Sequence, residues 1–334
     1  GSKWNTGALG FISGSLNVEA GGEVYSSDAT MATNNGTQAT ATVTGAGSKW
    51  TTSGELVIAN EGIASMFVEN GGQVSSMTGI IGAEVGSNDP GTGTVRVIGA
   101  GSSWTNSNSL TIGNLGIGTL SIEDGGETSN TSGFIGQQSG STGTVIVTGV
   151  NSKWTNSDSL LVGSKGTGTL NVEKRGQVSS DLGFIGAQAG SSGTVTVTGI
   201  DSKWINADDL FVGFEGTGTL NVNNGGLVSV GGDTSINATS QVNVSGGRFE
   251  FGTTDQTSFK RINAVSGSLA GTVNVSGLHA ASSFTALTTA ADSSDVIVVN
   301  SGRLFGDGLL GASIVNLSNG QIRVSSNQFM AFEG

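Results

Sequence analysis

A tryptophan that recurs about every 50 residues constrains this chain more than any other feature. Trp4, Trp50, Trp104, Trp154 and Trp204 are spaced 46, 54, 50 and 50 residues apart. Repetition at a fixed period of roughly 20 to 50 residues is the signature of solenoids, propellers and other arrays of one structural unit. The chain is therefore predicted to stack copies of a single unit.

The two irregular spacings locate a deletion and an insertion. From each Trp to the first apolar residue of the following LNV-like segment there are 16 residues in four copies, but 12 from Trp4 to Leu16. The return to the next Trp takes 34 residues in three copies, but 38 between Met66 and Trp104. We therefore expect four residues to be missing from the first copy. Four extra residues, Ser87–Pro90, are expected in a corner loop outside the stacked units.

Short segments of alternating apolar and polar residues predict the fold. Each unit contains about six of them, bounded by Gly, Ser or Asn, and alternation with period two favours β-strands. Three short strands per turn give a coil of about 25 residues, so one unit makes two coils of a β-solenoid. The predicted fold is all-β, a parallel β-helix. Regular repeats are expected over residues 1–228, and a continuation with irregular coils over residues 229–334.

Equivalent positions of successive units are expected to stack into ladders inside the solenoid. Burial of each aliphatic side chain there contributes about 1.5–3 kcal/mol. Intervening residues such as Asn171 would face solvent, and Phe67 would expose its ring. The tryptophans are interpreted as corner or core residues rather than as sugar-stacking platforms. The inward ladder comprises Leu16, Met66, Leu120, Leu170 and Leu220, with Val18, Val68, Ile122, Val172 and Val222 beside it.

Two rows of charge follow the same period. The members of a row would lie about 10 Å apart, near one Debye length at about 0.1 M salt. We expect solvated rows whose members do not perturb one another's ionisation. The cationic row is Lys3, Lys49, Lys153 and Lys203, and the acidic row is Glu19, Glu69, Glu123 and Glu173.

Composition argues against several classes of function. The 334-residue chain has no Cys and one His, which excludes disulfides, thiolate metal sites and zinc clusters. A net charge of −12 with few, dispersed basic residues argues against a nucleic-acid partner. No apolar run approaches the roughly 20 residues that a spanning helix needs. No cofactor and no metal site are expected.

Catalytic motifs are weak. A Ser-His-Asp set would depend on His279 alone, and the nucleophile strings GDSGSP and GDS do not occur. Asp208 and Asp209 resemble a carboxylate pair, but adjacent residues of a strand point to opposite faces. We expect no enzymatic activity, with a polysaccharide-active solenoid enzyme as the less favoured alternative.

The repeats TVTVTGIDSKWINADDLFVGFEGTGTLNVNNGG, with their GFIG segment, and the later SGRLFGDGLLGASIVNLSNGQIRVSSN carry a resemblance to a known family. They resemble the passenger domains of bacterial type V (classical) autotransporters over most of the chain. The resemblance implies a right-handed parallel β-helix and secretion, to the bacterial outer-membrane surface or the extracellular medium. It also implies that membrane attachment runs only through a C-terminal translocator barrel, which these 334 residues do not include.

The same resemblance implies a binding function. The preferred interpretation is an adhesin or virulence factor that binds a host cell-surface protein or glycan. The alternative is a released effector that engages a host receptor as a growth-factor-like, angiogenic ligand. Candidate interaction residues are Phe67 on the outer face and Glu84, Asn88, Asp89 and Pro90 around the insertion. The sequence leaves the oligomeric state open.

Overall fold

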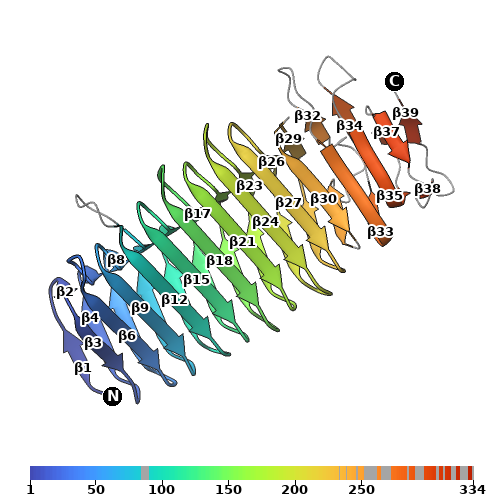
Figure 1. Cartoon of the computed structure of the whole chain (residues 1–334). Coiled ribbons are helices and arrows are strands. Elements are labelled where there is room, and N and C mark those ends of the chain that lie inside the picture. The colour runs from blue at the N-terminus through green and yellow to red at the C-terminus, as the bar shows by residue number, and fades with distance from the viewer. Residues whose placement is uncertain are drawn as a thin grey trace.

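The protein is an elongated stack of coils built from short parallel strands (Figure 1). The computed structural model describes residues 1–83, 90–232, 234–237, 239–245 and 247–251, and beyond these the strands β32 to β39. The described part is all-β, and its strand pairings are parallel in each of the three sheets that wrap the solenoid. The predicted parallel β-solenoid is confirmed.

Each regular coil contributes one strand to each sheet. The first sheet contains β3 (Gly14–Val18), β6 (Gln38–Thr44), β9 (Ile63–Glu69), β12 (Thr92–Ile98), β15 (Ile117–Glu123), β18 (Thr142–Thr148), β21 (Thr167–Glu173), β24 (Ser192–Thr198), β27 (Thr217–Asn223) and β30 (Gln241–Ser245). The second contains β1 (Lys3–Asn5), β4 (Glu23–Ser26), β7 (Lys49–Thr52), β10 (Gln73–Ser76), β13 (Ser103–Asn106), β16 (Glu127–Asn130), β19 (Lys153–Asn156), β22 (Gln177–Ser180), β25 (Lys203–Asn206), β28 (Leu227–Val230) and β31 (Arg248–Phe251).

The third sheet contains β2 (Leu9–Phe11), β5 (Ala29–Met31), β8 (Glu55–Ile58), β11 (Thr78–Ile81), β14 (Ser109–Ile112), β17 (Ser132–Ile135), β20 (Ser159–Val162), β23 (Leu182–Ile185), β26 (Leu210–Val212) and β29 (Thr234–Ile236). The later strands are β32 (Ile262–Ala264), β33 (Thr272–Ser283), β34 (Ala286–Thr289), β35 (Ile297–Phe305), β36 (Gly308–Leu310), β37 (Ser313–Asn316), β38 (Gln321–Arg323) and β39 (Met330–Phe332). The predicted boundary between residues 228 and 229 stays a prediction, since strands on both sides of it belong to the same sheets.

The strand register fixes the length of a coil. Leu120 lies opposite Val145, which lies opposite Leu170, so the first sheet advances 25 residues per coil. The 50-residue unit is therefore two coils, as predicted. In the part of the chain that is described, no helix is long and apolar enough to cross a membrane.

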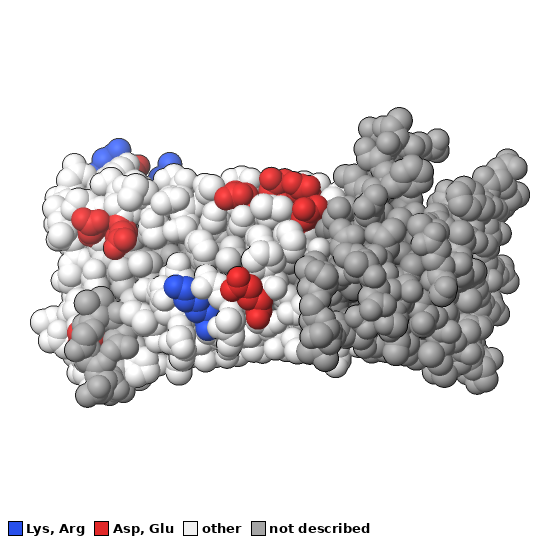
Figure 2. Space-filling model, turned by 90° about the horizontal axis from the view of Figure 1, so that it is seen from above, with Lys and Arg blue, Asp and Glu red and all other residues white. Residues whose placement is uncertain are grey.

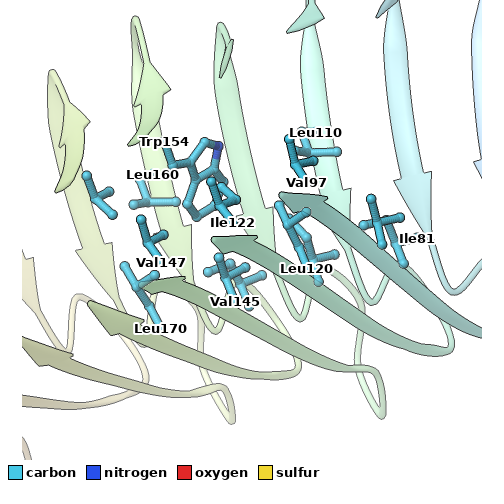
Figure 3. Close-up of a cluster of buried hydrophobic side chains, with 14 of the residues drawn as sticks. Ile81, Val97, Leu110, Leu120, Ile122, Val145, Val147, Trp154, Leu160 and Leu170 are labelled. Atoms are coloured by element: carbon cyan, nitrogen blue, oxygen red, sulfur yellow. The ribbon is translucent and has the colours of Figure 1, made fainter. Parts of the chain in front are cut away.

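The predicted inward ladder forms the core of the first sheet. Met66, Leu120, Leu170 and Leu220 are fully buried, whereas Leu16 in an end coil is only partly buried. The intervening coils add Val95, Val145 and Val195 to the same column, as the close-up of its central part shows (Figure 3). Apolar side chains thus continue without interruption from coil to coil.

The tryptophans form a second ladder in which large and small residues alternate. Trp50, Trp104, Trp154 and Trp204 are fully buried, and Trp4 in the end coil is 47% exposed. The coils between them place smaller residues at the same register. These smaller residues are Val24, Val74, Thr128, Val178 and Val228. The core interpretation of the tryptophans is confirmed for the four that lie between coils.

A matching alternation in the third sheet makes room for the indoles of Trp104, Trp154 and Trp204. Leu110, Leu160 and Leu210 alternate in register with Gly79, Gly133 and Gly183. A Cβ atom placed on Gly133 would lie 2.9 Å from Cζ2 of Trp154 and 3.0 Å from Cδ1 of Leu160 in the next coil. A coil with Trp and Leu at these two positions therefore alternates with a coil that has a small residue and Gly there. This alternation explains why the sequence repeats every two coils rather than every one.

A buried polar ladder receives the indole N–H groups of Trp104, Trp154 and Trp204, whereas that of Trp50 has no hydrogen-bond partner among the described residues. Nε1 of Trp154 donates a hydrogen bond to Oδ1 of Asn130 at 2.7 Å, and Nε1 of Trp204 donates to Oγ of Ser180 at 3.2 Å. Asn130 in turn donates from Nδ2 to Oδ1 of Asn156 at 2.6 Å. Each bond joins one coil to the next, so the ladder satisfies polar groups that would be costly to bury alone.

Gly133 offers a direct test of this packing. Gly133→Ala is expected to lower the free energy of unfolding by about 1–3 kcal/mol, because the methyl group overlaps the indole of Trp154. Chemical denaturation measures the change, and Gly10→Ala, where nothing lies within 4 Å of the added Cβ, is the control. Combining Gly133→Ala with Trp154→Leu should cost less than the sum of the single changes, whereas additive costs would contradict the packing.

The inward ladder is tested by a pair of neighbouring substitutions in β21. Leu170→Asp should cost several kcal/mol, because it places a carboxylate between apolar neighbours above and below. Asn171→Asp should be tolerated, because this side chain points outward from the same strand. The measurement is the shift in melting temperature of each variant from the wild-type chain. Equal shifts would show that the inward and outward assignment is wrong.

Candidate interaction surfaces

The outer face of the first sheet presents uncharged hydroxyl groups at regular intervals. Six consecutive coils place a threonine at the same register, and each of these side chains is partly exposed. Figure 2, turned by 90° from the view of Figure 1, shows another side of the molecule, where charged side chains gather in a few groups with uncharged surface between them. The column of hydroxyls comprises Thr94, Thr119, Thr144, Thr169, Thr194 and Thr219.

The predicted cationic row also contains acidic residues. Register in the second sheet places Glu23 between Lys3 and Lys49, and Glu127 opposite Lys153. Nζ of Lys3 lies 2.8 Å from Oε2 of Glu23, and Nζ of Lys153 lies 3.8 Å from Oε1 of Glu127. Hydrogen bonding to Lys3 is the main cause that lowers the pKa of Glu23, and the same contact raises the pKa of Lys3.

The acidic row is likewise not independent of its surroundings. Nε and Nη2 of Arg96 donate to the two carboxylate oxygens of Glu123 at 3.1 and 2.9 Å, and Oγ of Ser121 donates at 2.7 Å. The hydrogen bonds from Arg96 are the main cause that lowers the pKa of Glu123, while partial burial acts against them. No other member of the acidic row contributes to this shift. It arises because the intervening coil brings a cation to half the spacing of the row.

This ion pair predicts a pH dependence of stability. The lowered pKa means that the contribution of Glu123 is present above the ordinary glutamate pKa and is lost as the pH falls through its lower folded-state value. Glu123→Gln should therefore lower the melting temperature slightly at neutral pH, and flatten its fall between about pH 5 and about pH 3. Glu215→Gln, at an exposed residue, is the control; an unchanged acid limb in Glu123→Gln would contradict the assignment.

The structure separates the candidate residues chosen from the sequence. Phe67 is half-buried on the outer face of β9, opposite Thr42 and Arg96. Pro90 is exposed at the corner before β12. Roughly 15–20 Å of extended chain separates it from Arg96, the residue that lies opposite Phe67. Glu84, Asn88 and Asp89 lie outside the described residues. Phe67 and Pro90 therefore do not belong to one site.

The insertion itself falls between strands that keep their register. Ile81 of β11 lies opposite Ile112, and Thr92 of β12 lies opposite Ile117. In the sequence the insertion falls between these two strands, and Ser87, Asn88 and Asp89 lie outside the described residues. Their role in binding stays a prediction.

The aspartate pair considered for catalysis lies at a corner. Asp208 is exposed and Asp209 is half-buried, just before β26. The backbone N–H of Asp208 donates to the carbonyl of Asp181, and that of Asp181 donates to the carbonyl of Asp158, so these three aspartates lie one coil apart. Among the described residues, no group of three or more His, Cys, Asp or Glu is placed to hold a metal ion. The side chain of His279 lies outside the described residues.

The third sheet carries an outward-facing apolar stripe that the sequence interpretation missed. Phe134, Leu161, Phe184 and Phe211 share one register on consecutive coils, and we call them the third-sheet stripe. Phe184 and Phe211 stack with ring centroids 4.8 Å apart and planes 10° from parallel. Phe214, at the next corner and 54% exposed, meets Phe211 edge to face at 5.3 Å. A small cavity opens beside these two rings, lined also by Gly213, Ser235 and Asn237.

The sequence did contain a signal for this stripe. Ile185 is fully buried and Phe184, its neighbour in β23, is not. Neighbouring residues of a strand face opposite ways, so two adjacent large apolar residues require one of them to point out of the solenoid. The GFIG segments could have been interpreted in this way.

Comparison with known proteins gives little. No family model and no curated protein matches the chain. Among solved structures it is similar to the crystal structure of the TibC-catalyzed hyper-glycosylated TibA55-350 fragment, with 17% sequence identity and a TM-score of 0.48. That match covers 99% of this chain and 100% of the other. None of these comparisons assigns the chain to a family.

Proposed function

We propose that the chain is an autotransporter-type passenger exposed on the outer-membrane surface or released from it. In this proposal it acts without catalysis, as an adhesin that binds a host cell-surface protein or glycan. The observation that carries the proposal is the third-sheet stripe, with Phe214 beside it. The four stripe residues are partly exposed and Phe214 is exposed. Contiguous apolar side chains at a protein surface mark interaction sites.

The solenoid supports such a role physically. Its ladders repeat the same outward chemistry on every coil, as the column from Thr94 to Thr219 shows. Many weak contacts at a fixed spacing gain in total affinity through multivalency. A tethered rod would therefore bind a surface more strongly than any one of its coils would.

One observation favours the alternative of a released, growth-factor-like effector. The aromatic residues of the stripe are confined to β17 through β26. The same register in the preceding coils holds Thr30, Val57, Ile80 and Thr111. A local patch of this kind suits a single receptor epitope better than repeated adhesion does.

Cell binding by the purified chain tests the proposed function. Phe184→Thr combined with Phe211→Thr should reduce binding to epithelial or endothelial cells about tenfold, because it removes the two stacked aromatic anchors. Threonine already occupies this register at Thr111, so the fold should persist. Ile146→Thr, on the outer face of the first sheet, is the control. Undiminished binding by the double variant would refute a role for the stripe, and receptor phosphorylation by the soluble chain alone would favour the effector.

Removing Ser87–Pro90 separates the insertion from the rest of the surface. The shorter corner should change the free energy of unfolding by less than about 1 kcal/mol, because loop closure depends weakly on length. Calorimetry and cell binding on the same variant are the measurements. Full binding would eliminate the insertion as an epitope, and a large fall in melting temperature would contradict its position outside the coils.

A further inference from the structure

We propose that the third-sheet stripe is the docking site for a basic amphipathic α-helix of a partner protein, lying parallel to the solenoid axis. This inference builds on the proposed binding function and names the chemistry of the partner. It depends on three features of the same coils: an apolar outer face, a parallel row of carboxylates, and the spacing between coils.

The first feature is a sheet that is apolar on both faces. Leu210 and Val212 of β26 are fully buried inside the solenoid, while Phe211 between them points outward. In β20 the same pattern places Leu161 outside, between the fully buried Leu160 and Val162. Strands with continuous apolar residues are typical of sheets covered on both faces. The outer face of the third sheet thus has the composition of a covered surface.

The second feature is the charge beside the stripe. Asp158, Asp181 and Asp208 are exposed at the corner three residues before Leu161, Phe184 and Phe211, respectively. Three residues of strand span about 10 Å, so the carboxylates and the apolar side chains form two parallel rows. Charge complementarity calls for an occupant with an apolar face and cations along one flank.

The carboxylates are available to such an occupant. Asp158 accepts hydrogen bonds from the hydroxyls of Ser132 and Ser159 at 3.1 and 3.2 Å, which orient its side chain at the corner. In the described part of the chain, none of the ion pairs formed by lysine or arginine involves Asp158, Asp181 or Asp208. Among the described residues, no lysine or arginine therefore competes with a partner's cation for these three carboxylates.

The third feature is the spacing, which favours a helix over an extended segment. Successive coils lie about 4.8 Å apart, and one helical turn advances about 5.4 Å. A helix along the axis therefore places one turn over each coil and drifts by only about 2 Å over the stripe. Side chains on one face of an extended strand repeat every 6.6–6.8 Å or so, and lose this correspondence within two coils.

A synthetic peptide tests the proposal directly. The probe is a helix-forming peptide of about 18 residues, with Leu and Phe on one face, Arg along one flank and Ala elsewhere. Fluorescence anisotropy of the labelled peptide with the whole chain should show saturable binding that weakens as salt is raised. A version with Glu for Arg should not bind, and a scrambled version of the same composition should bind at least about tenfold more weakly.

Two sets of variants assign the binding to the stripe and to the acidic row. Phe184→Thr with Phe211→Thr should weaken the peptide about tenfold and keep the salt dependence. Asp158→Asn, Asp181→Asn and Asp208→Asn together should also weaken it about tenfold, and remove most of that dependence. The controls Ile146→Thr, on the outer face of the first sheet, and the triple change Glu19→Gln, Glu69→Gln and Asp124→Asn should bind normally. Circular dichroism confirms that every variant is folded.

The proposal is overturned if the wild-type chain does not bind the peptide, if the Glu version binds equally, or if either stripe or aspartate variants bind like wild type. Sedimentation showing a dimer that Phe184→Thr with Phe211→Thr dissociates would assign the face to a second copy instead. Binding to phosphatidylcholine vesicles that the same variant abolishes would assign it to lipid. Cell binding without peptide binding overturns this inference alone. If the peptide binds the chain but the stripe variant binds cells like wild type, the proposed function alone is overturned.

Discussion

The fit of the Trp104, Trp154 and Trp204 indoles into the space above a glycine of the preceding coil is the interaction on which the regular part of this solenoid depends. Trp154 occupies the volume that a Cβ on Gly133 would take, and its N–H reaches Asn130 in the same preceding coil. A large residue in every coil would overfill the interior, and a small one in every coil would leave cavities. Alternation fills the space, and it sets the two-coil repeat that the sequence displays.

This alternation also controls the surface, because each repeat position has a neighbour only half a repeat away. The charged rows that look isolated at 50-residue spacing meet Glu23 and Arg96 in the intervening coils. Coulomb attraction and hydrogen bonding rise steeply over such a change in distance. The pKa of Glu123 is therefore lowered by Arg96. The 50-residue period does not predict this contact, since Arg96 has no counterpart in the other copies.

The three outer faces of the solenoid differ in their chemistry. The first sheet presents a column of threonine hydroxyls, the second presents mixed charges, and the third presents the aromatic stripe with aspartates beside it. The third face carries an apolar stripe on four consecutive coils, unlike the polar exterior that a solvated sheet favours. Its apolar and acidic residues lie within the same coils, so we place the specific partner there and assign weaker, repeated contacts to the hydroxyl face.

By itself the sequence determined the all-β solenoid, the two coils per repeat and the inward ladder around Leu170, since each depends on periodicity along one chain. It could not determine which residues of different coils become neighbours, because the offset between them differs from sheet to sheet. Trp154 faces Thr128 across 26 residues, whereas Leu160 faces Gly133 across 27. Only the tertiary structure decided these pairings. The stripe from Phe134 to Phe211, the aspartate row beside it and the Arg96–Glu123 pair all arise from such stacking, which is why they were absent from the candidate residues chosen by sequence.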